Sequence, residues 1–419
     1  MELSVAALTD VGRVRTNNED SYFSDRDLGL FIVCDGMGGH NAGEVASQAT
    51  CDVLVREVTA ASRLRERFLS TGSPEDADAL RRLLDDAMNA ASREIFKRAS
   101  KEPELAGMGT TCTAMLVIGH EKALLAQVGD SRIYLHRAGR IHQITDDHTY
   151  VNELVRRGSL TREQTRGHPQ GNVLSRAMGV QPWVAADTML FDLDPGDIYL
   201  LCSDGLHNYF PEADQLIPGL VSPDLERGTK ALVREALDRG GHDNVTAILV
   251  RVEGTAAEPA VTADRRIVTL KRVPLFRQLT YNELVRVVGL TSVARAAEGQ
   301  VVAREGDAGS ELYVVLSGEV DVEKSGRPAG TLGLGAHFGE LALIDAAPRS
   351  ATVRARTPTS LLVLRRPELL ALVQSEPVIA SKLLWSFVLA LSGRLPEGAG
   401  ALASGTDEFE VVVGDETAG

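Results

Sequence analysis

The chain of 419 residues is poor in cysteine and has no long hydrophobic run. Its four cysteines form no C-x-x-C pair, and Cys34, Cys112 and Cys202 stand inside apolar segments. This placement predicts buried, reduced thiols and excludes a C-x-x-C redox or zinc motif. The longest apolar stretch, near Leu383–Leu391, is about half of the ~20 residues that a membrane span requires, and no basic segment precedes an apolar run at the N-terminus. We therefore expect a cytoplasmic protein that does not enter the membrane.

The chain also lacks an excess of positive charge. It carries 44 Lys and Arg residues against 58 Asp and Glu residues, which gives a formal net charge of −14. Such a balance argues against binding to nucleic acid or to an anionic membrane surface. An acidic protein can still bind phosphate, but only through a local cluster of cations or through a metal ion.

The length predicts two domains, because single hydrophobic cores stop growing near about 250 to 300 residues. Over residues 1–253, short apolar runs bounded by Gly or Asp alternate with amphipathic helical segments. Ile198–Cys202 and Val245–Val252 are predicted strands, and Ala42–Thr59 and Ala77–Ala99 are predicted helices. Strands with tight connections and helices between groups of them predict a layered α/β domain.

The second half has a different composition. Residues 254–267 are small and aperiodic, which predicts a linker, and a second domain is expected over 268–395. A predicted helix at Tyr281–Gly289 leads into short strands separated by many glycines, a pattern typical of an all-β roll. Another helix is predicted at Pro377–Leu395, and the Gly-rich and acidic tail 396–419 is predicted to be disordered.

Acidic residues stand where apolar runs of the first domain begin or end. The set comprises Asp35 in VCDGMGG, Asp130 in QVGDSR, Asp204 in LCSDGL, Asp243 in HDNVT, and the pair Glu19 and Asp20 in RTNNED. Any one of these is most simply an ordinary turn residue. If the strand ends converge, however, several carboxylates share a small volume and need a cation between them. A donor set made of oxygen alone favours Mg²⁺ or Mn²⁺ over Zn²⁺.

Six segments, in this order, resemble the motifs of the type 2C family of metal-dependent protein phosphatases. They are VRTNNED (14–20), VCDGMGG (33–39), GTT (109–111), VGDSR (128–132), SDGL (203–206) and HDNVT (242–246). The resemblance covers about residues 1–253. It implies an antiparallel β-sandwich flanked by helices, with two Mn²⁺ or Mg²⁺ ions in a cleft at one end.

The resemblance also implies roles for individual residues. Asp35 would bridge the two ions, and Asp204 and Asp243 would bind the first of them. The carbonyl group of Gly36 would bind the second ion.

The resemblance implies roles for three further residues. Glu19 and Asp20 would hold waters on the second ion, and Asp130 would help to hold a third, weaker metal ion.

Substrate binding is predicted to depend on Arg15, because a guanidinium group matches phosphate oxygens in a bidentate way. Arg13 is the weaker alternative. Animal relatives carry a histidine at the position of Met37, where it is thought to protonate the leaving oxygen, so the general acid stays open and a water is a plausible replacement. The polar segment 149–178 falls where the family carries a mobile flap, and we expect it to select substrate.

Three segments of the second half resemble the cyclic-nucleotide-binding domain. They are REGD (304–307), YVVLSGEV (313–320) and FGELALIDAAPRSATV (338–353). The resemblance implies that Glu340 accepts from the ribose hydroxyl and that Arg349 pairs with the cyclic phosphate. The full expected site is Gly339, Glu340, Leu341, Arg349 and Ser350. The hydroxyl of Ser350 does not distinguish cAMP from cGMP.

The sequence therefore predicts a phosphatase for phosphoserine and phosphothreonine in proteins, whose water nucleophile is activated by a binuclear centre. Phosphorylated targets of a cognate serine/threonine kinase are the expected partners, and a bound cyclic nucleotide is the expected regulator. Two alternatives stay open. The chain could be a catalytically silent nucleotide sensor, or an active phosphatase whose second domain is a docking module without ligand.

Overall fold

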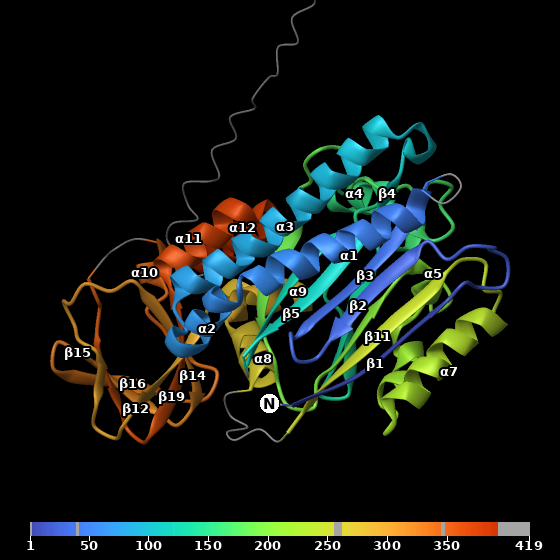
Figure 1. The fold of residues 1–419 in the computed structure, drawn as a ribbon. Helices are drawn as coiled ribbons and strands as arrows, with labels where there is room; N and C mark the ends of the chain where they lie inside the picture. The colour runs from blue at the N-terminus through green and yellow to red at the C-terminus, as the bar shows by residue number, and fades with distance from the viewer. Residues whose placement is uncertain (1, 39–41, 120, 255–261, 345–347, 393–419) are drawn as a thin grey trace, which may run out of the picture.

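The computed structural model describes residues 2–38, 42–119, 121–254, 262–344 and 348–392. Its N-terminal part contains two antiparallel sheets that pack face to face (Figure 1). In order, the first sheet consists of β1 (Glu2–Asp10), β11 (Val245–Glu253), β10 (Ile198–Cys202), β7 (Arg132–Arg137) and β8 (Arg140–Gln143). The second consists of β2 (Asp20–Asp25), β3 (Leu30–Met37), β5 (Cys112–Ile118), β6 (Lys122–Val128) and β9 (Asp187–Asp192), with β4 (Gly109–Thr110) beside β3.

Strand β3 illustrates why the sandwich forms. Phe31 and Val33 point into the space between the sheets, whereas Leu30, Ile32 and Cys34 pack beneath the helices on the outer face. All five side chains are buried. Because successive side chains of a strand alternate between faces, an unbroken apolar run fits a strand that is covered on both sides.

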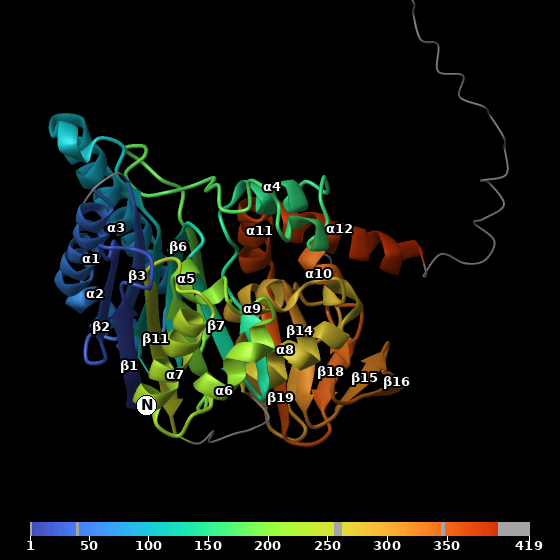
Figure 2. The same cartoon turned by 90° about the vertical axis from the view of Figure 1, so that its right-hand side faces the viewer.

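Helices cover both outer faces of the sandwich (Figures 1 and 2). The second sheet is covered by α1 (Ala42–Ala60) and α3 (Pro74–Lys101), with α2 (Ser62–Thr71) between them. The first is covered by α5 (Asp204–His207), α6 (Ile217–Leu220) and α7 (Leu225–Asp238). The segment before β9 carries α4 (Tyr150–Arg156), and 3-10 turns occupy Pro103–Leu105, Glu163–Thr165, Ala213–Leu216 and Pro274–Phe276.

The C-terminal part begins with α8 (Ala263–Arg272) and α9 (Tyr281–Gly289), followed by two four-stranded antiparallel sheets. One sheet consists of β12 (Ser292–Ala296), β19 (Thr359–Arg365), β14 (Glu311–Ser317) and β17 (His337–Phe338). The other consists of β13 (Val301–Ala303), β18 (Thr352–Ala355), β15 (Val320–Lys324) and β16 (Arg327–Leu332). The helices α10 (Leu341–Ile344), α11 (Arg366–Ser375) and α12 (Pro377–Ser392) complete it. The predicted fold class, a helix-flanked sandwich plus an α+β domain built on a β-roll, is confirmed.

The expected linker 254–267 differs from the structure at its end, because α8 already begins at Ala263. The carboxylate of Asp194, from the first half, accepts the backbone N–H of Ala263 at 2.8 Å and of Asp264 at 3.0 Å. This cap satisfies two N–H groups that the start of a helix leaves unpaired. Residues 255–261 lie outside the described part of the chain.

The two halves share one hydrophobic core. The cluster inside the sandwich continues through α8 and α9 to β14, β19, α11 and α12. Helix α9 packs on the edge strand β9, where a side chain at Gly289 would overlap the carbonyl oxygen of Leu190. The C-terminal part is therefore fixed to the sandwich by direct packing.

The helix predicted over Pro377–Leu395 is present as α12, and its last three residues and the tail 396–419 lie outside the described residues. All four cysteines are buried and free, as predicted. Among the described residues, no helix combines the length and the apolar character that crossing a bilayer requires.

Candidate active site

The strand register brings the acidic residues to one end of the sandwich. Asp20 opens β2 and pairs with Asp35 on β3, so the two carboxylates stand on directly opposite positions of neighbouring strands. Asp204 follows the end of β10, and Asp243 precedes the antiparallel neighbour β11. Asp35 lies within β3 rather than after it, which is a small difference from the sequence expectation.

A pocket of about 350 Å³ opens between these residues and the segment that follows α4. Its lining comprises Asp35, Met37, Thr111, Asp130, Asn172, Leu174, Ser175, Arg176, Ala177, Val180 and Asp204. Three of the predicted metal-binding residues, Asp35, Asp130 and Asp204, therefore share one cavity with the predicted flap.

The three carboxylates that line this pocket, Asp35, Asp130 and Asp204, are half-buried and repel one another. Burial raises the pKa of Asp35 well above its usual range, and the neighbouring charges of Asp20 and Asp204 raise it further. Burial and the charge of Asp204 raise the pKa of Asp130 to about 8. Burial and the charge of Asp243 raise the pKa of Asp204 as well. Such a cluster is unfavourable as a set of anions unless a cation is added.

Asp20, on strand β2 of the second sheet, is held by two hydroxyl groups from the first sheet. Its Oδ2 accepts from Ser203 Oγ at 2.8 Å and from Thr246 Oγ1 at 2.6 Å. Its Oδ1 is buried and has no hydrogen-bond partner among the described residues. Burial raises the pKa of Asp20 to about 7 even though both hydroxyl contacts act to lower it.

Glu19 reaches the site through a close approach of backbones. A side chain at Gly36 would overlap the backbone oxygens of Gly43 and Glu19, and a Cβ atom at Gly43 would lie 2.8 Å from Cδ of Glu19. Burial raises the pKa of the Glu19 carboxyl, although Arg15 and the backbone of Gly43 counteract it. Gly36 and Gly43 are thus required where the segment that carries Glu19 contacts β3.

Arg15 lies beside the pocket and pairs with Asp243. Its Nη2 donates to Asp243 Oδ2 at 2.7 Å, and both side chains are about half exposed. This hydrogen bond raises the pKa of Arg15, and the charges of Glu19 and Asp35 add to it. Arg13 instead pairs with Asp238 at 3.3 Å on the surface.

The donor set fits a hard divalent cation. It consists of carboxylate oxygens, one of them buried without a partner, whose raised pKa values express mutual repulsion. In the described part of the chain, no group of three or more His, Cys, Asp or Glu side chains is arranged so that it could hold a metal ion. In this structure Asp243 faces Arg15 rather than its neighbouring carboxylates.

Residues 12–239 match the family model described as Protein phosphatase 2C, a span of more than half of the chain. The chain belongs to the protein phosphatase 2C family. The resemblance read from the six motifs is thereby confirmed. The phosphatase also matches the model of the cyclic nucleotide-binding domain over residues 293–376.

Related proteins agree with this assignment. The serine/threonine phosphatase stp of Listeria innocua is 36% identical over 245 residues, which cover 58% of this chain and 93% of the relative. The crystal structure of the Mycobacterium tuberculosis serine/threonine phosphatase PstP/Ppp is 38% identical, with a TM-score of 0.53, and covers 61% of this chain and 100% of its own. A structure of the PstP catalytic domain in complex with two manganese ions is 36% identical, with a TM-score of 0.51, and covers 60% of this chain and 99% of its own.

The second predicted site lies in the C-terminal half of the phosphatase. The side chain of Arg349 is buried, and it donates to Glu311 Oε2 at 2.7 Å and to the Glu311 carbonyl at 2.8 Å. A side chain at Gly309 or Gly339 would overlap the guanidinium. Glu340 and Leu341 follow Gly339 directly, and Ser350 is exposed beside Arg349.

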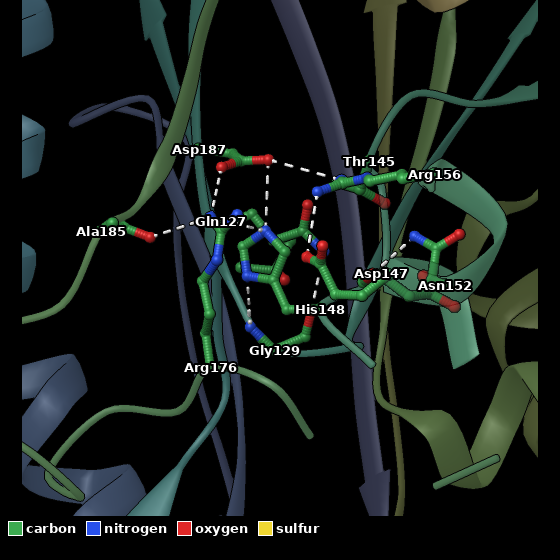
Figure 3. Close-up of polar contacts among 12 residues, drawn as sticks. Gln127, Gly129, Thr145, Asp147, His148, Asn152, Arg156, Arg176, Ala185 and Asp187 are labelled. Carbon is green, nitrogen blue, oxygen red and sulfur yellow. Dashed lines mark hydrogen bonds and ion pairs between the residues drawn. The ribbon is translucent and has the colours of Figure 1, made fainter. Parts of the chain in front are cut away.

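In the first half, beside the carboxylate pocket, lies a further group of polar residues to which the sequence analysis assigns no role (Figure 3). Arg132 forms a bidentate pair with Asp147, and His148 contacts Gly129 and Asp187. The run of Asp146, Asp147 and His148 after β8 is the only local signal for these contacts. Their partners lie 15 to 39 positions away in the sequence and could not be predicted from it.

Proposed function

We propose that the phosphatase hydrolyses phosphoserine and phosphothreonine in proteins, with Mn²⁺ or Mg²⁺ bound among the carboxylates of the pocket. One observation carries this proposal: three half-buried carboxylates with raised pKa values, Asp35, Asp130 and Asp204, line one cavity. The printed names of the relatives, and the two manganese ions of one related structure, support it.

Seven residues would hold the ions: Glu19, Asp20, Asp35, Gly36, Asp130, Asp204 and Asp243. Two bound ions would lower the pKa of a water and orient it for in-line attack on phosphorus. The protein's own contribution is to fix the carboxylates at one end of the sandwich, with Asp20 and Asp35 on adjacent strands. The pairing of Asp20 with Asp35 and the hydroxyl contacts of Asp20 perform this positioning.

Arg15 would bind the phosphate of the substrate. Its side chain is half exposed at the edge of the site and already binds one carboxylate oxygen, so its fork of donors is suitably placed for an anion. No histidine lines the described pocket, where Met37 is present instead. We propose that a water protonates the leaving oxygen.

The test uses the full chain and a phosphothreonine peptide. Phosphate release should require added Mn²⁺ or Mg²⁺ and stop when the metal is chelated. Arg15→Ala should raise KM more than it lowers kcat, because it weakens phosphate binding without removing the nucleophile. Arg13→Ala is the matched control, since Arg13 pairs only with a surface carboxylate. An unchanged KM for Arg15→Ala would exclude the phosphate role.

We further propose that a cyclic purine nucleotide, cAMP or cGMP, binds near Arg349 and changes the activity. The expected contacts are Gly339, Glu340, Leu341, Arg349 and Ser350. The hydrophobic core that the two halves share supports a coupling between nucleotide binding and phosphatase activity. Two ion pairs also support it, because they connect α12 and the residue before it to α9: Lys382 with Glu283 at 2.7 Å, and Arg286 with Glu376. A coupling of about 1 to 3 kcal/mol would change activity about 5- to 150-fold.

The measurement compares kcat/KM on a phosphoprotein with and without saturating nucleotide, for the full chain and for a chain that ends before Pro377. Equal values in the full chain would remove the coupling and favour a docking module without ligand. A cytoplasmic location, and substrates phosphorylated by a cognate serine/threonine kinase, belong to the same proposal.

A further inference from the structure

His148 is a completely buried histidine outside the pocket lining, and its ring contacts Gly129 and Asp187 (Figure 3). Its backbone N–H donates to the Gly129 carbonyl at 2.9 Å, and its Nδ1 accepts the Gly129 N–H at 3.2 Å. Both polar groups of Gly129 are therefore bound by one residue. Gly129 directly precedes Asp130, the pocket carboxylate that is expected to hold the weaker metal ion.

The flap side of the pocket is held by the same residue. The His148 carbonyl accepts the N–H of Ser175 at 2.8 Å, and Thr149 pairs with Leu174. The N–H of Tyr150 adds a bond to the Val173 carbonyl at 2.8 Å. This short ladder places Leu174 and Ser175 in the pocket lining opposite Asp130.

The hydrogen bonds fix the tautomer of the His148 ring. A backbone N–H can only donate, so Nδ1 must carry no proton and Nε2 must carry one. The Nε2–H then points to Asp187 Oδ2, at 3.2 Å. Only this neutral tautomer satisfies both contacts at once.

Asp187, at the start of β9, connects the ring to the rest of the flap. Its Oδ1 accepts from Arg176 Nη1 at 2.6 Å, and Arg176 itself lines the pocket. Burial alone would raise the pKa of Asp187, but His148 and Arg176 outweigh burial and hold it well below the usual range. Asp187 therefore stays ionised and orients two donors, one on each of its oxygens.

We infer that His148 is a positioning residue that sets Asp130 and the flap in register across the active site. It acts through Gly129 on the metal side, and through Ser175 and Asp187 on the flap side. The inference rests on the proposed metal-dependent phosphatase activity. The two ring nitrogens of His148 have different roles: Nδ1 supports the metal site, and Nε2 supports the substrate side.

Two substitutions separate these atoms. Glutamine at position 148 can place an amide nitrogen near Nε2 but offers no acceptor near Nδ1, whereas asparagine can place an oxygen near Nδ1 but cannot reach Asp187. His148→Gln should weaken the binding of Mn²⁺ at the weaker site and lower kcat by about 10- to 100-fold, the usual range for the loss of a residue that supports a metal ligand. His148→Asn should keep Mn²⁺ affinity within about threefold of the wild type and raise KM.

The experiment titrates Mn²⁺ into the full-length wild type, His148→Gln and His148→Asn by calorimetry, and measures kcat and KM for a phosphothreonine peptide. His136→Gln on β7 is the matched control and should change neither quantity. Asp187→Asn is the second route if His148→Gln does not fold, and it should reproduce the effect of His148→Asn.

Equal Mn²⁺ affinities in the wild type and His148→Gln would overturn the inference, as would equal losses in His148→Gln and His148→Asn. The inference is also overturned if the Asp187→Asn variant loses Mn²⁺ affinity but keeps the KM of the wild type. Failure of the proposed function has a different signature, because the wild type itself would then show no metal-dependent hydrolysis.

Discussion

The pairing of Arg349 with Glu311 leads to a quantitative prediction for nucleotide binding. The two side chains are 8% and 28% exposed, and a 2.7 Å bond joins them. A cyclic phosphate that binds Arg349 must compete with this carboxylate or share the guanidinium with it. Glu311→Gln removes the competing charge and keeps the shape of the side chain, so we expect it to strengthen nucleotide binding.

The size of the effect follows from the contact. A hydrogen bond to a charged group contributes about 1.5 to 3 kcal/mol, and each 1.4 kcal/mol is a tenfold change in Kd. The variant should therefore bind cAMP or cGMP about 10- to 100-fold more tightly. Without nucleotide it should be less stable than the wild type, because the buried Arg349 loses its ionic partner.

Calorimetry with cAMP and cGMP on the full-length protein measures the gain, and thermal unfolding without nucleotide measures the loss. Glu319→Gln is the matched control, since Glu319 pairs with Arg356 at 3.7 Å on the surface of the same half. Equal or weaker binding by Glu311→Gln would refute the competition. Absence of binding to both proteins would favour the docking module.

Two further predictions concern the contact between the halves. Gly289→Ala should destabilise the protein by about 1 to 3 kcal/mol in chemical unfolding, because the added methyl group forces α9 away from Leu190, and an unchanged midpoint would contradict this packing. The ring of His142 stacks on Tyr281 with centroids 3.5 Å apart, and burial lowers the pKa of His142 from 6.5 to about 4. The folded state thus binds fewer protons than the unfolded state between these values, so stability falls as pH falls from about 6.5 to about 4. Thermal unfolding of His142→Phe should show a smaller fall over this range, and equal falls would refute the assignment.

The sequence predicted those elements whose signals are local. The strand Ile198–Cys202 and the helix Tyr281–Gly289 agree with their predicted bounds, because an apolar run defines the first and the capping box of Thr280 and Glu283 starts the second. The start of α8 falls within the predicted linker. Its N-cap Thr262 is local, but the two further N–H groups at its start are bound by Asp194, about 70 residues away in the chain.

For the two predicted sites, too, local motifs could be recognised in the sequence, whereas contacts between distant residues could not. Motif order indicated which carboxylates to consider, and the pairing of Asp20 with Asp35 brings two of them together. The partners of Arg15 and Arg349 could not be predicted, since each is chosen by folding. Asp243 lies 228 positions from Arg15, and Glu311 lies 38 positions from Arg349, with no periodic pattern between them.

The role of the pocket carboxylates is tested most directly at Asp204, which lines the pocket together with Asp35 and Asp130. The measurement is the rate of phosphate release from a phosphothreonine peptide by the full chain with Mn²⁺, for the wild type and for Asp204→Ala. We predict metal-dependent turnover by the wild type and almost complete loss of kcat in Asp204→Ala. The control variant Asp214→Ala, in the turn before α6, should retain the activity. Wild-type kcat in Asp204→Ala would contradict the account.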